Sequence, residues 1–229
     1  MIRDADCPQA MWLGLRIWVH SARPKTLPAA VAPVLIGAGM AFHDGGTNAL
    51  VFLAILGATL CIQIGTNYAN DYFDFIKGAD TGQRVGPIRA TAAGLVSPGQ
   101  MLGASTVVFG VAALLGLYLV AMGGWPILVI GLVSIACGVL YTAGPFALGY
   151  MGLGDLFVLV FFGPVAVGGT YYLLCASINT PVLVAGLAPG LISCAILAVN
   201  NYRDRHTDKD SGKRTLVVRW GDEFGRLEY

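Results

Sequence analysis

One stretch of sequence limits what this chain can fold into more than any other feature. Between Thr91 and Tyr202 it contains a single formal charge, Asp155. Charged residues make up 12% of the whole chain, whereas soluble globular proteins carry about 25%. A soluble fold cannot cover its surface with so few charges, so a water-soluble enzyme is excluded. A nucleic-acid binding module is excluded as well, because the net charge is only +1 and the sequence has no basic stripe.

Six apolar segments are candidates for membrane helices, which need about 20 residues to cross the hydrocarbon core. The predicted spans are residues 27–42, 48–68, 98–122, 125–141, 156–176 and 180–199. Backbone polar groups in lipid must be satisfied within each segment, and these runs lack the alternation of a membrane β-barrel. The sequence therefore predicts an all-α fold, a polytopic transmembrane helix bundle.

The basic residues give this bundle a predicted orientation. All 14 Lys and Arg fall before the first span, between the second and third, or after the sixth. Segments rich in Lys and Arg stay in the cytoplasm under the positive-inside rule. We therefore expect a multi-pass protein of the cytoplasmic (inner) membrane, with its N-terminus on the cytoplasmic side. The connection 142–155 has no Lys or Arg, so its placement on that side rests on parity alone.

An acidic stretch follows the second predicted span. If that helix continues, four residues share one face at i, i+3, i+4 and i+7 spacing: Asn67, Asn70, Asp71 and Asp74. Gly78 is expected to end or loosen the helix, and Asp80 follows in the loop.

A similar stretch follows the sixth predicted span. Asn200, Asp204 and Asp208 are spaced i, i+4 and i+8, so they again share a face. Both stretches have an Asn-rich entry, an aspartate pair about one turn apart, and then Gly and Lys. We expect two related halves whose acidic ends converge on one site. Both Asp motifs are expected on the cytoplasmic side of the membrane.

Paired carboxylates of this kind favour a divalent cation. Carboxylates one turn apart repel each other by a few tenths of a kcal/mol, about 0.2–0.5, and a hard cation removes that cost. Mg²⁺ binds oxygen ligands, typically one or two carboxylates together with substrate phosphates. The sequence therefore predicts Mg²⁺ carrying a diphosphate. Five basic residues nearby are placed to pair with the remaining phosphate oxygens: Lys77, Arg84, Arg89, Arg203 and Lys213.

The chemistry that fits is departure of diphosphate from a lipid-soluble allylic substrate. The resulting carbocation needs a dry, polarisable wall, for which Tyr141 and Tyr150 are favoured because they flank the loop near the acidic ends. Seven further aromatic residues are candidates: Phe73, Phe146, Phe157, Phe161, Phe162, Tyr171 and Tyr172. A divalent cation transporter and a structural scaffold remain as alternatives. The transporter is disfavoured because the aspartates lie at helix ends rather than at the bilayer midplane.

The motifs themselves resemble those of a known family. Asn-Asp-xx-Asp-xxxxx-Asp at 70–80, paired with Asn-Asn-x-Arg-Asp-xxx-Asp-xxx-Gly-Lys-x-Thr at 200–215, is similar to the UbiA superfamily of membrane prenyltransferases. The wording around these motifs is closest to the 1,4-dihydroxy-2-naphthoate polyprenyltransferases of menaquinone biosynthesis. Further matches are Arg-Pro-Lys-Thr-Leu-Pro at 23–28, Gly-Pro-Ile-Arg-Ala at 86–90 and Leu-Gly-Tyr-Met-Gly-Leu-Gly-Asp at 148–155.

The resemblance implies a reaction and a set of roles. The reaction is Mg²⁺-dependent transfer of a polyprenyl group from polyprenyl diphosphate to 1,4-dihydroxy-2-naphthoate, with decarboxylation to demethylmenaquinol. Metal ligands would be Asn70, Asp71, Asp74, Asp80, Asp204 and Asp208. Tyr141 would line the pocket of the cation. Substrate contacts would come from Asn67, Asn70, Lys77, Arg89, Asn200, Asn201, Arg203, Lys213, Arg23 and Lys25.

Two departures from the family pattern affect what is expected. Many relatives carry a Lys shortly after the tyrosine equivalent to Tyr141, and this chain does not, which counts against 4-hydroxybenzoate as acceptor. That acid, homogentisate and a porphyrin remain alternatives. The family has nine spans, so residues 1–229 are expected to be a single UbiA-type domain that is incomplete at its C-terminus. Expected partners are the two substrates and the bilayer, with no nucleic acid; the sequence leaves the oligomeric state open.

Overall fold

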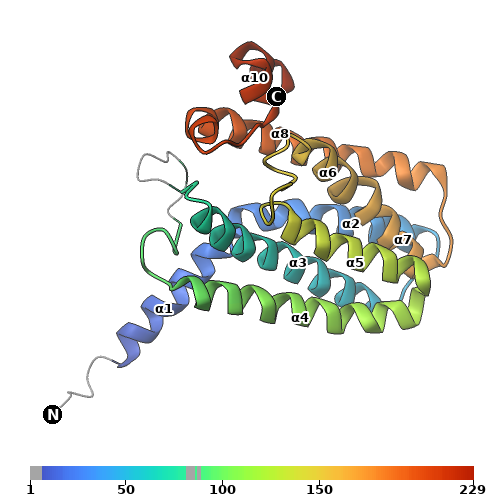
Figure 1. The fold of residues 1–229 in the computed structure, drawn as a ribbon. Coiled ribbons are helices and arrows are strands. Elements are labelled where there is room, and N and C mark those ends of the chain that lie inside the picture. Colours follow the sequence, from blue (N-terminus) through green and yellow to red (C-terminus); the bar gives the residue numbers. More distant parts are fainter. Residues whose placement is uncertain (1–6, 81–85, 87–88) are drawn as a thin grey trace.

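The structure is a computed structural model that describes residues 7–80, 86 and 89–229. Every regular element within those residues is helical, which confirms the predicted all-α class. The elements are α1 (Cys7–Ser21), η1 (Pro24–Thr26), α2 (Leu27–His43), α3 (Ala49–Ile76), α4 (Pro98–Gly123), α5 (Trp125–Leu140), α6 (Gly154–Val160), η2 (Phe161–Val165), α7 (Ala166–Cys175), α8 (Thr180–Asp210), α9 (Leu216–Trp220) and α10 (Asp222–Glu228) (Figure 1).

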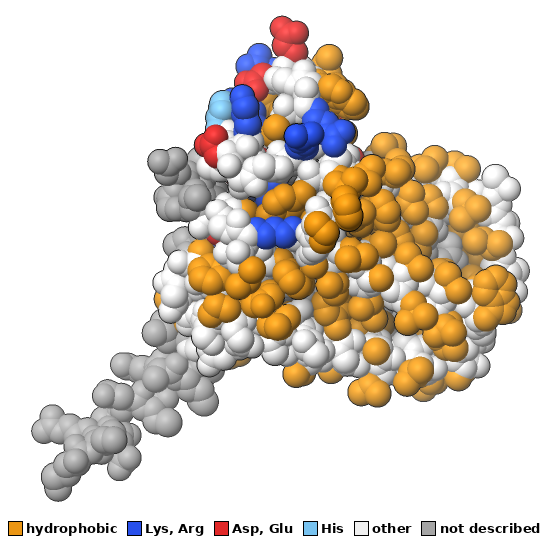
Figure 2. Space-filling model, in the orientation of Figure 1, with side chains coloured by type: hydrophobic (Ala, Val, Ile, Leu, Met, Phe, Trp, Pro, Cys, Tyr) orange, Lys and Arg blue, Asp and Glu red, His pale blue; other side chains and the backbone are white. Residues whose placement is uncertain are grey.

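Most of the predicted spans are long enough to cross a bilayer. Five apolar helical stretches qualify: Gly14–His43, Ala49–Ile76, Pro98–Gly123, Gly154–Cys175 and Thr180–Asp210. The sixth, α5, has 16 residues and rises roughly 24 Å at 1.5 Å per residue. Hydrophobic side chains cover the flank of the bundle, and charged side chains gather at the end that carries α9 and α10 (Figure 2). The protein is therefore a multi-pass membrane protein with one short span.

The long helices begin at residues that satisfy their first free N–H groups. At the start of α3, the side chain of Asn48 accepts a hydrogen bond from the Val51 N–H at 3.1 Å. At the start of α8, Asn179 does the same for the Val182 N–H at 3.0 Å. Ser97 begins α4 with a capping box. These caps fix where each span starts, and so where its acidic or aromatic end lies.

The fifth predicted span is not one continuous α-helix, in contrast to the prediction. It runs as α6, a π-helical turn (η2) and α7, with a kink at Gly163 (φ −113°, ψ −115°). Pro164 has no N–H to continue the helical hydrogen bonds. A Cβ atom at Gly163 would lie 2.7 Å from the Gly186 carbonyl oxygen of α8. Glycine therefore lets the bent span approach α8 closely.

The helices pack in an order that brings both acidic ends together. α3 lies along α4 and contacts α5, while α2 packs against α7 and α8, and α6 and η2 pack on α8. The connections α2–α3, α4–α5 and α7–α8 lie at one end of the bundle (Figure 1). There the Tyr171 hydroxyl donates to Asp44 at 2.6 Å, which ties α7 to the end of α2. The C-terminal ends of α3 and α8 lie at the opposite end.

Candidate functional site

The ends of α3 and α8 share the same local geometry. The backbone N–H five residues after each aspartate returns to that aspartate's carbonyl oxygen, at 2.9 Å for Asp74 and 2.8 Å for Asp208. Each helix is followed by a left-handed glycine, Gly78 (φ +67°) and Gly212 (φ +78°). This is the Schellman arrangement, in which glycine takes the positive φ without steric cost. Asp74 and Asp208 therefore occupy equivalent positions on two helices far apart in the sequence.

These two ends line one polar pocket of about 200 Å³. α3 stays helical through the whole predicted acidic face, and its residues there are buried. Predicted residues that line the pocket are Arg23, Asn70, Asp71, Asp74, Arg89, Tyr141, Asn200, Asn201, Arg203, Asp204, Asp208 and Lys213. The structure therefore gathers both motifs around one space.

Other predicted residues lie next to this pocket. Asn67 donates to the Ala22 carbonyl oxygen at 2.9 Å and lines an adjoining apolar cavity. Lys77 donates to the Gly144 carbonyl oxygen at 2.8 Å. The side chain of Asp80 is buried, with a carboxylate oxygen 3.5 Å from the Arg89 Nε. These three residues contact the surroundings of the pocket rather than its interior.

Lys25 precedes α2 and does not line the polar pocket. Arg84 and residues 87–88 of the predicted 86–90 motif lie outside the described residues.

Asp74 is the centre of the polar contacts. Its Oδ2 accepts a hydrogen bond from Arg89 Nη2 at 2.9 Å, and its Oδ1 accepts one from the Tyr150 hydroxyl at 3.0 Å. The Lys213 ammonium lies 3.4 Å from the same Oδ1 and 3.8 Å from Oδ1 of Asp208. One lysine thus stands between carboxylates of both acidic helix ends.

Asp71 and Asn70 are held by other parts of the chain. The two carboxylate oxygens of Asp71 accept the backbone N–H groups of Thr91 at 3.0 Å and Ala90 at 3.1 Å. The Thr142 hydroxyl donates to Asn70 Oδ1 at 2.8 Å. Residues 90–91 and Thr142 of the α5–α6 connection are therefore both docked on the acidic face of α3.

Arg203 and Asp204 form a close pair on α8. Two guanidinium nitrogens of Arg203 donate to the two oxygens of Asp204, each at 2.7 Å. Such a bidentate pair fixes the orientation of both groups. It leaves cationic and anionic groups side by side at the pocket, which suits an anion bound together with a cation.

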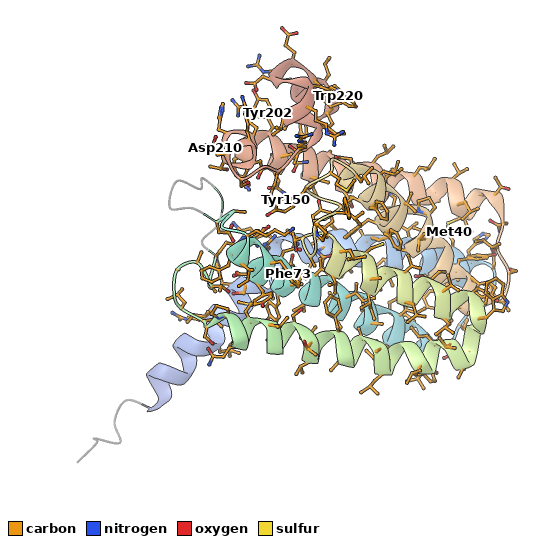
Figure 3. All side chains as sticks on the ribbon, in the orientation of Figure 1. Met40, Phe73, Tyr150, Tyr202, Asp210 and Trp220 are labelled. Carbon is orange, nitrogen blue, oxygen red and sulfur yellow. The ribbon has the colours of Figure 1, made fainter. Side chains whose placement is uncertain are left out.

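Tyr150 belongs to the site but appeared in the sequence only as a candidate for the aromatic wall. Its ring lies 4.2 Å from the Lys77 ammonium and 4.9 Å from that of Lys213. Burial, together with the negative charge of Asp74, raises the pKa of its hydroxyl, so the hydroxyl stays a donor at neutral pH. In Figure 3 it lies between the α8 end near Asp210 and the α3 end near Phe73.

Several other lining residues were not predicted: His20, Ser21, Thr26, Thr142, Gly149, Leu197 and Thr215. Thr26, Gly149 and Thr215 fall within the motifs quoted for the family resemblance, but none of the seven is among the spaced aspartate and asparagine residues from which the site was predicted.

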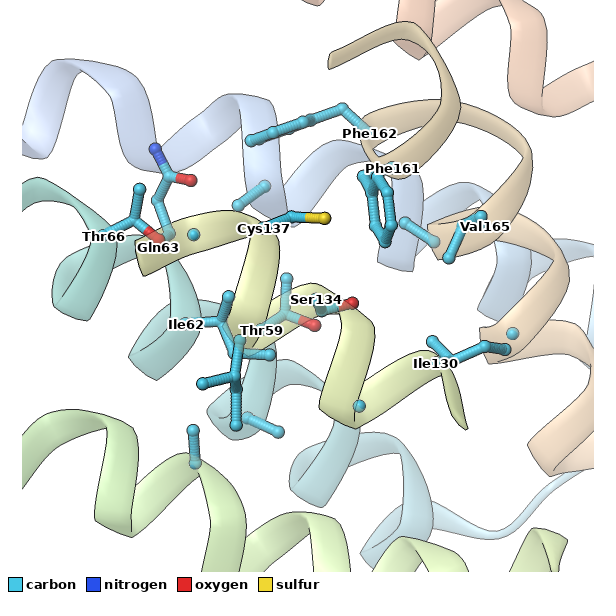
Figure 4. Close-up of a pocket in the computed structure, with 18 of the residues that line it drawn as sticks. Thr59, Ile62, Gln63, Thr66, Ile130, Ser134, Cys137, Phe161, Phe162 and Val165 are labelled. Carbon is cyan, nitrogen blue, oxygen red and sulfur yellow. The ribbon is translucent and has the colours of Figure 1, made fainter. Parts of the chain in front are cut away.

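An apolar cavity of about 510 Å³ adjoins the polar pocket, and the two share Arg23, Thr26, Asn70, Tyr141 and Leu197. Among the aromatic candidates, Tyr141, Phe157, Phe161 and Phe162 line this cavity; Phe161 and Phe162 are labelled in Figure 4. Phe146 and Tyr171, which were also candidates, do not line the cavity. Phe146 is 76% exposed, and Tyr171 bonds Asp44 at the opposite end of the bundle.

The donor chemistry of the pocket fits Mg²⁺ bound together with phosphate. The candidate ligands are all carboxylate or amide oxygens, which Mg²⁺ prefers. Lys213 already places a positive charge between Asp74 and Asp208. Within the described part of the chain, no three acidic, His or Cys side chains are grouped to hold one ion by themselves. Phosphate oxygens would therefore have to complete the coordination.

Comparisons with known proteins agree with this geometry. Residues 30–228 match the model of the UbiA prenyltransferase family. A 1,4-dihydroxy-2-naphthoate octaprenyltransferase of Mycobacterium tuberculosis is 42% identical over 93% of this chain and 72% of its own length. One of Haemophilus influenzae is 38% identical with the same coverage of each chain.

A solved structure from work on digeranylgeranylglyceryl phosphate synthase in membranes matches with a TM-score of 0.64. The match covers 94% of this chain and 73% of the other, and the two are 18% identical. At that identity the likeness shows a shared fold.

Proposed function

This chain belongs to the UbiA prenyltransferase family, and from that premise we propose that it transfers a polyprenyl group to 1,4-dihydroxy-2-naphthoate. The donor is a polyprenyl diphosphate, and the acceptor loses its carboxyl group as CO₂ to give demethylmenaquinol, a step of menaquinone biosynthesis. The choice of acceptor is supported by the names of the relatives at 38–42% identity.

One observation carries the proposal: the polar pocket and the apolar cavity share lining residues, among them Asn70 and Tyr141. A polyprenyl diphosphate has one densely charged end and one long apolar tail. Its diphosphate would lie among the paired aspartates and basic side chains, and its tail among Phe157, Phe161 and Phe162. The reacting carbon would then lie near Tyr141, at the boundary between the two spaces.

Members of the family are generally dependent on a divalent metal, and we assign Mg²⁺ to the acidic groups of this site. Carboxylates of Asp74, Asp204 and Asp208 would hold it, together with diphosphate oxygens. Asn70, Asp71 and Asp80 are further candidate ligands. The chemistry supplied by bound Mg²⁺ is neutralisation of the negative charge that builds up on the departing diphosphate.

The chain's own residues do the rest. Arg203 and Lys213 bring positive charge to the diphosphate, and the Tyr150 hydroxyl holds Asp74 in place. The bond between the prenyl carbon and oxygen breaks, and the ring carbon that bears the carboxylate forms the new carbon–carbon bond. Loss of CO₂ returns its electron pair to the ring, so aromaticity is restored without removal of a ring proton.

We place the protein in the cytoplasmic membrane, with the polar pocket on the cytoplasmic side. The support is the distribution of Lys and Arg, which gathers at the end of the bundle that holds the acidic helix ends.

The proposal is tested with membranes that contain the protein, radiolabelled farnesyl diphosphate and Mg²⁺. Lipid-soluble product is expected with 1,4-dihydroxy-2-naphthoate and not with 4-hydroxybenzoate, and EDTA abolishes it. Asp71→Ala and Asp204→Ala are expected to insert into the membrane but give no product. Metal flux into vesicles without prenylation would instead support a transporter and overturn the proposal.

A further inference from the structure

The segment after α8 is tied to the α5–α6 connection by one hydrogen bond from the Arg219 side chain and one from the Arg214 backbone. Arg219 Nη2 donates to the Met151 carbonyl oxygen at 2.7 Å. Arg219 Nε donates to the Arg214 carbonyl oxygen at 3.1 Å. The Arg214 N–H in turn donates to the Tyr150 carbonyl oxygen at 2.9 Å. One guanidinium therefore bridges two chain segments that lie far apart in the sequence.

Each of the two segments carries part of the polar pocket. The α5–α6 connection carries Thr142, which bonds Asn70, and Tyr150, which bonds Asp74. The segment after α8 carries Lys213, which lies between the two aspartates. The bonded Tyr150 and Arg214 backbones are next to these groups, so a shift of one segment against the other would move Tyr150 and Lys213 relative to Asp74.

Gly152 permits the two segments to approach this closely. It has φ +71°, and a Cβ atom there would lie 2.7 Å from the Arg214 carbonyl oxygen and 3.3 Å from Arg219 Nε. Gly144, in the same connection, has φ +75° with nothing within 4 Å of its Cβ position. Of these two glycines, Gly152 alone combines a left-handed backbone with a close contact to the segment after α8.

We propose that Arg219 is a positioning residue for diphosphate binding, which rests on the proposed function. Its guanidinium holds the α5–α6 connection against the segment after α8, so that Tyr150 and Lys213 reach Asp74 together. The planar fork of arginine suits two carbonyl acceptors at fixed angles. A lysine ammonium can reach one carbonyl but cannot reproduce that fork.

The alternative is that Arg219 acts only as a surface charge toward lipid. Arg214 provides the matched comparison, because it is an exposed arginine of the same segment that joins the bridge through its backbone alone. Arg214→Gln removes the same charge and keeps the bridge. Arg219→Gln removes the charge and both side-chain hydrogen bonds.

The first measurement uses the whole chain in nanodiscs, with inorganic diphosphate and Mg²⁺ as the probe. The apparent affinity for diphosphate is read from the shift in melting temperature at increasing probe concentration. Arg219→Gln is expected to weaken this affinity about tenfold, because hydrogen bonds from a charged donor are lost. Arg219→Lys is expected to lie between Arg219→Gln and wild type. Arg214→Gln is expected to match wild type. Equal effects of Arg219→Gln and Arg214→Gln would overturn the proposal in favour of a charge effect.

The second measurement separates positioning from general damage. With farnesyl diphosphate as donor, Arg219→Gln is expected to raise the KM for the donor about tenfold, while kcat and the KM for the naphthoate change less than about twofold. Gly152→Ala is expected to reproduce this pattern, and Gly144→Ala, which shares the positive φ, is not. Because Gly152→Ala and Arg219→Gln break the same contact, the double variant is expected to be no worse than either alone.

Failure of this proposal is distinguishable from failure of the proposed function. If wild type forms no prenylated product, the proposed function fails, while the diphosphate-binding measurement still tests Arg219. If wild type is active and Arg219→Gln binds inorganic diphosphate as wild type does, the positioning role is wrong and the proposed function stands.

Discussion

Arg89→Met is expected to lower the free energy of unfolding by about 3 kcal/mol, because the guanidinium neutralises two buried carboxylates. Arg89 lies 2.9 Å from Asp74 and 3.5 Å from Asp80, and the three side chains are 7%, 2% and 1% exposed. Removing one partner of a buried ion pair costs about 3–5 kcal/mol. We take the lower end because Asp74 keeps its contacts with Tyr150 and Lys213.

At about 2–4 °C per kcal/mol for a chain of this size, the melting temperature is expected to fall by about 10 °C. The assay is the fraction of protein in detergent that stays monodisperse after heating. Arg214→Met is the matched control, since it makes the same substitution at an exposed arginine and is expected to change stability by less than about 0.5 kcal/mol. Adding Asp80→Asn to Arg89→Met removes one of the two buried charges and is expected to recover about half of the loss.

A melting temperature of Arg89→Met within about 1 °C of wild type would refute this reasoning, because it would mean that water already screens both carboxylates. The double variant also tests the role that the family resemblance implies for Arg89. If the guanidinium binds the carboxylate of the acceptor, Arg89→Met with Asp80→Asn keeps a raised KM for the naphthoate although its stability recovers.

Three further predictions follow from contacts near the site. Tyr150→Phe loses the hydrogen bond to Asp74 and is expected to cost about 1.5 kcal/mol of stability. Because the pKa of the Tyr150 hydroxyl is raised, this loss, measured by thermal melting, is expected to stay constant from about pH 6 to about pH 9. Asp71→Asn gives up one acceptor for a backbone N–H and is expected to cost about 1 kcal/mol of stability. Proteolysis of the α3–α4 connection is expected to be faster in this variant, and unchanged cleavage would count against the docking of Ala90 and Thr91 on Asp71. Burial, with repulsion from Asp155, raises the pKa of Glu228 to about 7. The folded protein therefore binds that proton more tightly than the unfolded chain does, so the stability of docked α10 is greatest below about pH 4.5 and falls as the pH rises through about 7. Protection factors for hydrogen exchange in α10, which correct for the base-catalysed intrinsic rate, are expected to be lower at pH 8 than at pH 6 in wild type and equal at both in Glu228→Gln.

The sequence alone determined the helical spans and the composition of the acidic faces. Hydropathy decides which segments enter lipid, because unpaired backbone groups there cost several kcal/mol each, about 2–7. Helical periodicity puts Asn70, Asp71 and Asp74 on one face regardless of what that face meets. The same reasoning applies to Asp204 and Asp208. The glycine at 78 further predicted that the first acidic helix ends or loosens there, and α3 ends at Ile76.

Only the tertiary structure decided which groups meet those faces. The backbone N–H groups that hold Asp71, the Tyr150 hydroxyl on Asp74 and the two carbonyls on Arg219 come from connections without any repeating pattern. The kink at Gly163 likewise depends on how closely α8 approaches. Periodicity describes neighbours within one helix, whereas the contacts of Asp71, of Asp74 with Tyr150 and of Arg219 with Met151 join residues 19 to 76 positions apart. Their geometry is set by how the helices pack, which one-dimensional spacing does not encode.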